Sequence, residues 1–153
     1  MKYLPRWTLI LLVFAISAFA AFLFWPGTST GMMGAFLYSF PSEKSPSFDP
    51  CEYQEAVFAI ARSHGFEVSD TNVSDRDFPK RTDEIFIPPS YQRQFSARCT
   101  ATFYLCARED RVLAVYIRFP SASEFDRWRI GRTMESIRED LRPIQKAINQ
   151  KKI

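Results

Sequence analysis

The stretch from Trp7 to Trp25 constrains this chain most, because its nineteen consecutive residues carry no charge and are mostly apolar. Lys2 and Arg6 precede it, and Pro26 follows it. A helix of that length would extend roughly 28 Å, which is close to the hydrocarbon thickness of a bilayer. The pattern therefore predicts a transmembrane helix over 7–25, with a tryptophan at each end where an aromatic belt meets the lipid headgroups.

The charges that flank this segment indicate its direction. Lys2, Arg6 and the amino terminus lie before it, whereas the next charged residues after it, Glu43 and Lys44, nearly cancel. Because positively charged flanks stay in the cytoplasm, residues 1–6 are expected there and the rest of the chain outside. In a bacterium this predicts a single-pass anchor in the inner membrane that holds a periplasmic domain.

A cleaved signal peptide is the competing interpretation of the same segment. Ala18-Phe19-Ala20 fits the small-x-small cleavage pattern, and cleavage near Ala20 would release a periplasmic or secreted protein. Cleavage would leave residues 21–25 as an exposed apolar N-terminus, and the apolar run continues past the site to full spanning length. The retained anchor is therefore the preferred interpretation.

The rest of the chain divides into a linker and one domain. Residues 26–48 are rich in Gly, Ser and Pro, which is typical of a flexible linker. Within it, the apolar patch 35–40 could rest on the membrane or pack on the domain. Residues 49–153 are numerous enough for a single modest core.

Local patterns predict the elements of this domain. A first helix is expected from an N-cap at Asp49 to a terminating glycine at Gly65. Alternation of apolar and polar residues predicts strands over 66–73, 84–87, 95–107 and 112–119. Pro88-Pro89 is expected to end the second of these strands.

The last helix is expected to begin at a capping box formed by Ser121 and Glu124. Its buried stripe comprises Met134, Ile137, Leu141, Ile144 and Ile148. Pro143 is expected to kink or interrupt it. The order α-β-β-β(-β)-α predicts an α+β fold, an antiparallel sheet with two helices on one face.

The chain has three cysteines, which would enter an oxidising compartment if the domain is exported. Cys99 and Cys106 lie in one predicted strand, so they should face opposite sides about 23 Å apart. Cys51 is then expected to pair with one of them. Side-chain parity favours Cys51–Cys99, which is the preferred pairing, whereas a simple up-and-down strand order favours the alternative, Cys51–Cys106.

Motifs for catalysis are missing from the sequence. The single histidine, His64, precedes Gly65 at a helix end, where a cation suits the helix dipole. The acidic pairs at 83–84 and 139–140 lack the spacing of paired catalytic carboxylates. The sequence therefore predicts no enzyme, no cofactor and no metal site, and an envelope hydrolase is the least favoured class. Nucleic acid is not an expected partner, because the net charge is only +3 and the periplasm contains little of it.

Two surfaces are candidates for binding a protein. One is the polar stretch 74–94, because long loops with aromatic and Arg residues are frequent binding sites, although an ordinary surface loop has the same composition. The other is the polar face of strand 95–107, which would be open if both helices cover the opposite face. The candidate partner-binding residues are Arg76, Phe78, Lys80, Arg81, Asp83, Tyr91, Arg93, Arg98 and Tyr104.

The layout of an anchor, a linker and one small exported domain resembles that of the small anchored periplasmic immunity proteins, which protect bacteria from toxins acting in the envelope. The resemblance concerns architecture alone and implies no site residues. We therefore expect a non-enzymatic protein that binds another periplasmic protein, first as an inhibitor or immunity protein. The alternative is an accessory subunit of an inner-membrane complex for secretion, division or sensing.

Overall fold

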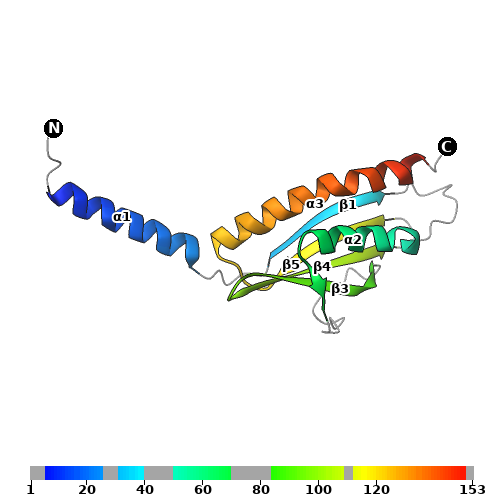
Figure 1. Ribbon diagram of the computed structural model, residues 1–153, viewed down its shortest axis with the longest axis horizontal. Helices are drawn as coiled ribbons and strands as arrows, with labels where there is room; N and C mark the ends of the chain where they lie inside the picture. The colour runs from blue at the N-terminus through cyan, green and yellow to red at the C-terminus, as the bar shows by residue number, and fades with distance from the viewer. Residues whose placement is uncertain (1–5, 26–30, 40–49, 70–83, 109–111, 151–153) are drawn as a thin grey trace.

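The computed structural model describes residues 6–25, 31–39, 50–69, 84–108 and 112–150. Its elements are α1 (Arg6–Phe24), β1 (Gly31–Ser39), η1 (Pro50–Tyr53), α2 (Gln54–Ser63), β2 (Glu67–Val68), β3 (Glu84–Ser96), β4 (Cys99–Arg108), β5 (Val112–Phe119) and α3 (Glu124–Gln150). An apolar N-terminal helix thus precedes a sheet and two further helices (Figure 1). The predicted α+β fold is confirmed.

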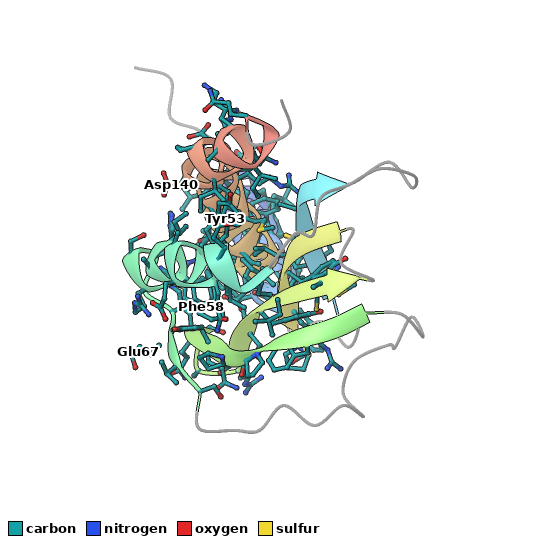
Figure 2. All side chains as sticks on the ribbon, turned by 90° about the vertical axis from the view of Figure 1, so that its right-hand side faces the viewer. Tyr53, Phe58, Glu67 and Asp140 are labelled. Atoms are coloured by element: carbon teal, nitrogen blue, oxygen red, sulfur yellow. The ribbon has the colours of Figure 1, made fainter. Side chains whose placement is uncertain are left out.

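The five strands form an open sheet in the order β1-β5-β4-β3-β2, and each neighbouring pair is antiparallel. Both α2 and α3 lie on one face of this sheet, as the sequence predicts. Viewed along the strands, the two helices stand on one side and the strands on the other (Figure 2). The opposite face is covered by neither helix.

Helix α1 is uncharged and mostly apolar from Trp7 to Phe24, and none of the residues in this window is buried inside the protein. The 18 residues Trp7–Phe24 have a mean hydropathy of 2.5. By length and composition this helix can cross a membrane. It is compatible with a membrane anchor and with a signal sequence.

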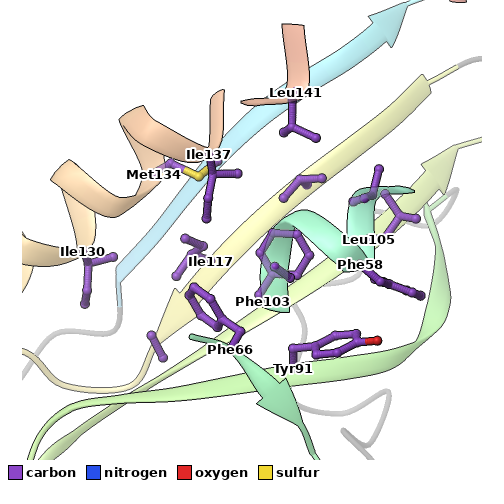
Figure 3. Close-up of a cluster of buried hydrophobic side chains, with 14 of the residues drawn as sticks. Phe58, Phe66, Tyr91, Phe103, Leu105, Ile117, Ile130, Met134, Ile137 and Leu141 are labelled. Atoms are coloured by element: carbon purple, nitrogen blue, oxygen red, sulfur yellow. The ribbon is translucent and has the colours of Figure 1, made fainter. Parts of the chain in front are cut away.

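The core lies between the helices and the sheet (Figure 3). Helix α2 contributes Val57, Phe58 and Ala61, because these positions recur on one side of a helix at spacings of three and four. The residues that α3 buries are Ile130, Met134, Ile137, Leu141 and Ile148, which include most of the predicted stripe. They meet alternate residues of the strands, among them Phe103, Leu105, Val115 and Ile117.

Residues 31–39, which the sequence places in the linker, form β1 at one edge of the sheet. Its glycines explain the difference. A Cβ built on Gly31 would lie 2.1 Å from the Phe119 ring, and one built on Gly34 would lie 2.7 Å from the Tyr116 ring. Because these glycines have no side chain, they leave room for two aromatic rings of β5. A glycine-rich segment that looks like a flexible linker can therefore also form a strand that packs under aromatic side chains.

The predicted strand 95–107 is two strands. β3 continues past Pro88-Pro89, which are joined by a cis peptide bond, and ends at Ser96. A two-residue turn, Ala97-Arg98, then leads into β4. The turn preserves the alternation, since Phe95 and Cys99 both face the core. This is why the sequence pattern does not reveal the break. The prolines are tolerated because the β3–β4 register shifts between Ile87 and Tyr91.

The C-terminal end of α2 confirms the predicted glycine stop. The Gly65 N–H donates to the Arg62 carbonyl at 2.9 Å and the Phe66 N–H donates to the Ala61 carbonyl at 3.1 Å, while Gly65 has φ of 75°. These are the two bonds of a Schellman motif.

Asp49, the predicted N-cap of α2, lies outside the described residues. The predicted strand 66–73 is represented by β2, which covers only 67–68.

Helix α3 begins later than predicted. Its cap is Ser123 rather than Ser121, because the Ser123 hydroxyl accepts the Asp126 backbone N–H at 3.1 Å and donates to the Asp126 carboxylate at 3.0 Å. The cap hydroxyl and Asp126 in the third helical position thus bond each other, as in a capping box, but through the Ser123 hydroxyl on both sides. The predicted interruption at Pro143 is wrong, since the helix continues to Gln150.

Candidate binding surfaces

The face of the sheet opposite the helices is defined by cross-strand rows, and we call it the open sheet face. The first row comprises Met32, Arg118, Thr102 and Gln92. The second comprises Gly34, Tyr116 and Tyr104. The third includes Ala114, Cys106 and Phe86. Strand pleating places these residues opposite the core residues of the same strands.

Aromatic side chains occupy the centre of the open sheet face. The Tyr104 and Tyr116 rings stack with centroids 5.4 Å apart, and the Phe86 ring lies 6.3 Å from that of Tyr104. The Tyr104 hydroxyl donates to the Met32 sulfur at 3.0 Å. Tyr104 is therefore almost fully buried, whereas Met32 remains 50 % exposed. The surface is apolar and aromatic at its centre, which is the chemistry of protein-binding hot spots.

Polar side chains border this aromatic centre. Thr100 and Gln94 are exposed, and Thr102, Gln92 and Arg118 are half-buried. A polar rim around an apolar centre is the usual anatomy of a protein–protein interface. A face of this kind suits contact with the surface of a folded partner.

The structure divides the nine sequence-predicted partner-binding residues. Arg76, Phe78, Lys80, Arg81 and Asp83 lie outside the described residues. Tyr104 lies on the open sheet face but is only 3 % exposed, so it supports the neighbouring rings and offers little surface of its own. Arg98 is exposed in the β3–β4 turn at one end of the sheet. Tyr91 and Arg93 lie on the opposite side of β3, so the nine do not form one site.

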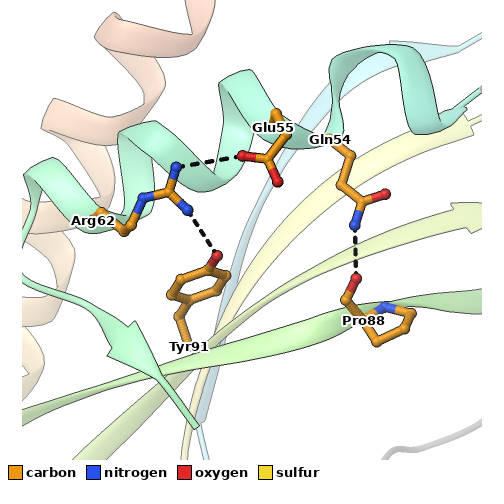
Figure 4. Close-up of polar contacts among 5 residues, drawn as sticks. All are labelled: Gln54, Glu55, Arg62, Pro88 and Tyr91. Carbon is orange, nitrogen blue, oxygen red and sulfur yellow. Dashed lines mark hydrogen bonds and ion pairs between the residues drawn. The ribbon is translucent and has the colours of Figure 1, made fainter.

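Tyr91 is a core residue and not a surface one. It is 2 % exposed, and its ring lies 5.0 Å from that of Phe58. Its hydroxyl accepts a hydrogen bond from Arg62 Nη1 at 3.1 Å (Figure 4). Nearby, the Gln54 side chain donates to the Pro88 carbonyl at 2.8 Å. The prediction that Tyr91 contacts a partner is corrected, because the side chain joins β3 to α2.

Arg93 also has a structural partner. Its guanidinium donates to the His64 carbonyl at 2.6 Å and lies 4.8 Å from the centre of the Phe95 ring. It therefore caps the C-terminal end of α2, where backbone carbonyls lack helical partners.

The residues that sequence reasoning missed on the open sheet face are Met32 and Tyr116, whereas Phe86 falls within the candidate stretch 74–94. Tyr116 lies between Val115 and Ile117, which face the core in a correctly predicted strand. Because neighbouring side chains of a strand point to opposite faces, Tyr116 could have been placed on the open sheet face from the sequence. Met32 had no such signal, because it lies in the glycine-rich segment that resembles a tether.

His64 connects the two helices of the domain. Its Nε2 lies 2.8 Å from Asp140 Oδ2, and these side chains are 16 % and 52 % exposed. The carboxylate comes from one of the acidic pairs noted in the sequence, and it joins the end of α2 to the middle of α3. Among the described residues, no three His, Cys, Asp or Glu side chains are grouped closely enough to hold a metal ion.

The predicted disulfide has no support in the described part of the chain, where no two cysteines lie within disulfide distance. Cys99 begins β4 and faces the core, at the end of the sheet opposite the start of α2. Cys106 is nearer to that start but lies on the open sheet face. Neither predicted pairing is therefore supported. The distance along the strand separates Cys99 from the start of α2, and the sheet itself separates Cys106 from it.

Cys99 belongs to a polar cluster at the beginning of α3. Burial of the thiol, and then the nearby Asp126 carboxylate, raise the pKa of Cys99, while Arg129 opposes them. Asp126 is buried and accepts hydrogen bonds from Ser96 at 2.9 Å and Ser123 at 3.0 Å. The cluster lines a cavity of about 350 Å³ together with Phe24 and Phe125. The Asp126 carboxylate in this cluster already accepts hydrogen bonds from two hydroxyl groups. The cluster therefore holds the start of α3 against the end of β3.

Comparison with known proteins identifies no relative. No protein-family model matches the chain, and no curated protein or solved structure is significantly similar to it. The α+β class therefore comes from the structure itself.

Proposed function

We propose that this chain is a membrane-anchored binding domain that holds another protein through its open sheet face, without catalysing a reaction. The observation that carries the proposal is the aromatic centre of that face, where the half-buried Phe86 and Tyr116 rings pack on the buried ring of Tyr104 and remain partly open to contact. Aromatic side chains fixed by mutual stacking lose little conformational entropy when they bind, so they suit protein recognition. Helix α1 would hold the domain on the periplasmic side of a bacterial inner membrane.

Within this class we favour an inhibitor or immunity protein that neutralises a toxin or enzyme acting in the envelope. Helix α1 has no charged residue between Trp7 and Phe24 and consists almost entirely of lipid-compatible side chains. Specific recognition would then reside in the folded domain. An accessory subunit of an envelope complex is the alternative, and it would more often depend on contacts made by α1 within the membrane.

Photo-crosslinking from the full-length chain in its membrane tests the proposed surface. A photoreactive phenylalanine analogue placed at Thr100 lies on the exposed rim of the open sheet face, and the matched control is the same analogue at Glu139 on the exposed side of α3. We expect one discrete adduct from position 100 that is lost in a Tyr116→Ser variant. Equal adducts from both positions, or an adduct only from position 139, would contradict the proposal.

Exchange of the anchor separates the two candidate functions. Residues 1–25 are replaced by an unrelated transmembrane helix with a basic N-terminal flank. For an inhibitor, the adduct from position 100 should persist, because recognition resides in the domain. Its loss would favour the accessory-subunit alternative.

A further inference from the structure

We propose that the end of the domain beside α1 rests on the bilayer surface, with Phe125 and Trp128 entering the headgroup region and Arg98 and Arg132 binding lipid phosphates. The inference depends on the proposed anchoring by α1 and adds a second, separate contact with the membrane. We call these four residues the lipid-facing end.

The first argument is position. The ring of Phe24, the last residue of α1, lies 5.2 Å from the ring of Phe125 in the first turn of α3. Trp25 and Glu124 line one shared cavity with the last turn of α1. Helix α3 therefore begins where a spanning α1 would leave the hydrocarbon, and it extends away from there along the long axis of the molecule (Figure 1).

The second argument is exposed aromatic surface. Trp128 is 62 % exposed, more than any other large hydrophobic side chain described after Trp25. The Phe125 ring stacks on it with centroids 5.9 Å apart. Indole and phenyl groups are stable at the boundary between headgroups and acyl chains, so lipid contact would cover surface that water now surrounds.

The third argument is charge. Arg98 is exposed in the β3–β4 turn, and the Arg132 side chain is 70 % exposed with only a 3.5 Å contact to Glu135. Both guanidinium groups can reorient toward an anionic surface. Arg129 cannot do so, because it donates to the Phe95 carbonyl and is held inside the cluster. Arginines that border aromatic residues suit the phosphate level of a bilayer.

The fourth argument is chain length. Gly31, the first residue of β1, is seven residues after Phe24. Even a fully extended chain of that length spans at most about 25 Å. The domain therefore stays within one domain diameter of the membrane, and a weak lipid contact acts at high effective concentration.

Tryptophan fluorescence of the full-length chain in liposomes tests this contact. The chain has three tryptophans, so a Trp7→Phe, Trp25→Phe variant reports only Trp128, and a Trp7→Phe, Trp128→Phe variant reports only Trp25. The control is Lys146→Trp in a chain without native tryptophans. Residue 146 lies on the same side of α3, five turns and about 27 Å beyond Trp128.

We expect lipids brominated near the headgroup to reduce the emission of Trp128 and Trp25 about twofold, and to leave the Lys146→Trp control unchanged. If Trp25 is quenched while Trp128 behaves like the control, the inference is wrong and the anchor stands. If neither is quenched, α1 does not lie in the bilayer and both proposals fail.

A charge-reversal variant tests the arginines separately. In vesicles containing phosphatidylglycerol, the Arg98→Glu, Arg132→Glu variant should return Trp128 emission toward that of the Lys146→Trp control. Arg142→Glu, at the far end of α3, is the matched variant and should change nothing. Unchanged quenching in the double variant would overturn the assignment of Arg98 and Arg132 to lipid phosphates.

Discussion

At the scale of single residues, the glycines of this chain serve different physical ends. Gly34 leaves room for the Tyr116 ring, and Gly65 has the positive φ that ends α2. Gly131 does neither. It lies inside α3, and a Cβ built there would meet only the end of Met33 at 3.9 Å, an ordinary van der Waals distance.

Gly131→Ala should therefore stabilise the protein by about 0.5 to 1 kcal/mol, because alanine loses less backbone entropy in a helix and finds space for its methyl group. Gly65→Ala is the matched change and should destabilise by about 1 kcal/mol, since it forces a positive φ on a residue with a Cβ. Urea denaturation in detergent measures both. A loss of stability in the first variant would show that Met33 cannot adjust.

Cys99 should make stability depend on alkaline pH. Its pKa is raised in the folded state, so unfolding favours ionisation of the thiol. The neutral, buried thiol contributes to the free energy of unfolding, and this contribution is fully present below the pKa of the thiol in the unfolded chain, near 9.0. It is lost as pH rises through the higher pKa of the folded state. The free energy of unfolding should fall above that pH in the native chain and fall less in Cys99→Ala. Identical pH profiles for the two chains would contradict the assignment.

At the scale of elements, the sequence predicted those whose signals are local. The apolar stripes of α2 and α3, the glycine stop of α2 and the alternation in β5 depend on neighbours a few positions away. β1 could not be predicted, because Gly31 and Gly34 suit a strand only beside the rings of Phe119 and Tyr116, more than eighty residues later. The β3–β4 turn is hidden because two residues preserve the alternation.

The candidate site was predictable only in part, for the same reason. Tyr104 could be placed on the open sheet face by parity within its own strand. Its contacts with Met32 and Phe86 depend on strand order, which local patterns do not specify. Tyr91 was misplaced because Pro88-Pro89 suggested a loop where β3 in fact continues into the core.

The contact between His64 and Asp140 should contribute to packing of α2 on α3. Asp140→Asn should lower the free energy of unfolding by about 0.5 to 1 kcal/mol, since the pair is partly exposed and solvent weakens it. Glu139→Gln removes the adjacent exposed carboxylate and serves as the control, with little expected change. Equal effects of the two variants would indicate general surface charge and not this specific contact.

At the scale of the whole molecule, β1 determines where a soluble domain can begin. A chain of residues 27–153 keeps β1 and should be a folded monomer. A chain of residues 46–153 would expose the edge of β5 and the core beside Val115 and Phe119. Such an edge invites pairing with other chains, so we expect this shorter form to associate in size-exclusion chromatography. A stable monomer of residues 46–153 would show that β1 is dispensable.

The pairing of β1 with β5 also means that β1 can join the sheet only after β5 has been synthesised. Gly31 pairs with Phe119, eighty-eight positions later, and among the strands that the structure describes β5 is the one neighbour of β1. A ribosome releases the first of these strands long before the second, so β1 must wait while the rest of the domain is synthesised. Closing so long a loop is slow, and until it closes the nascent chain presents two unmatched backbone edges to whatever chaperones accompany it.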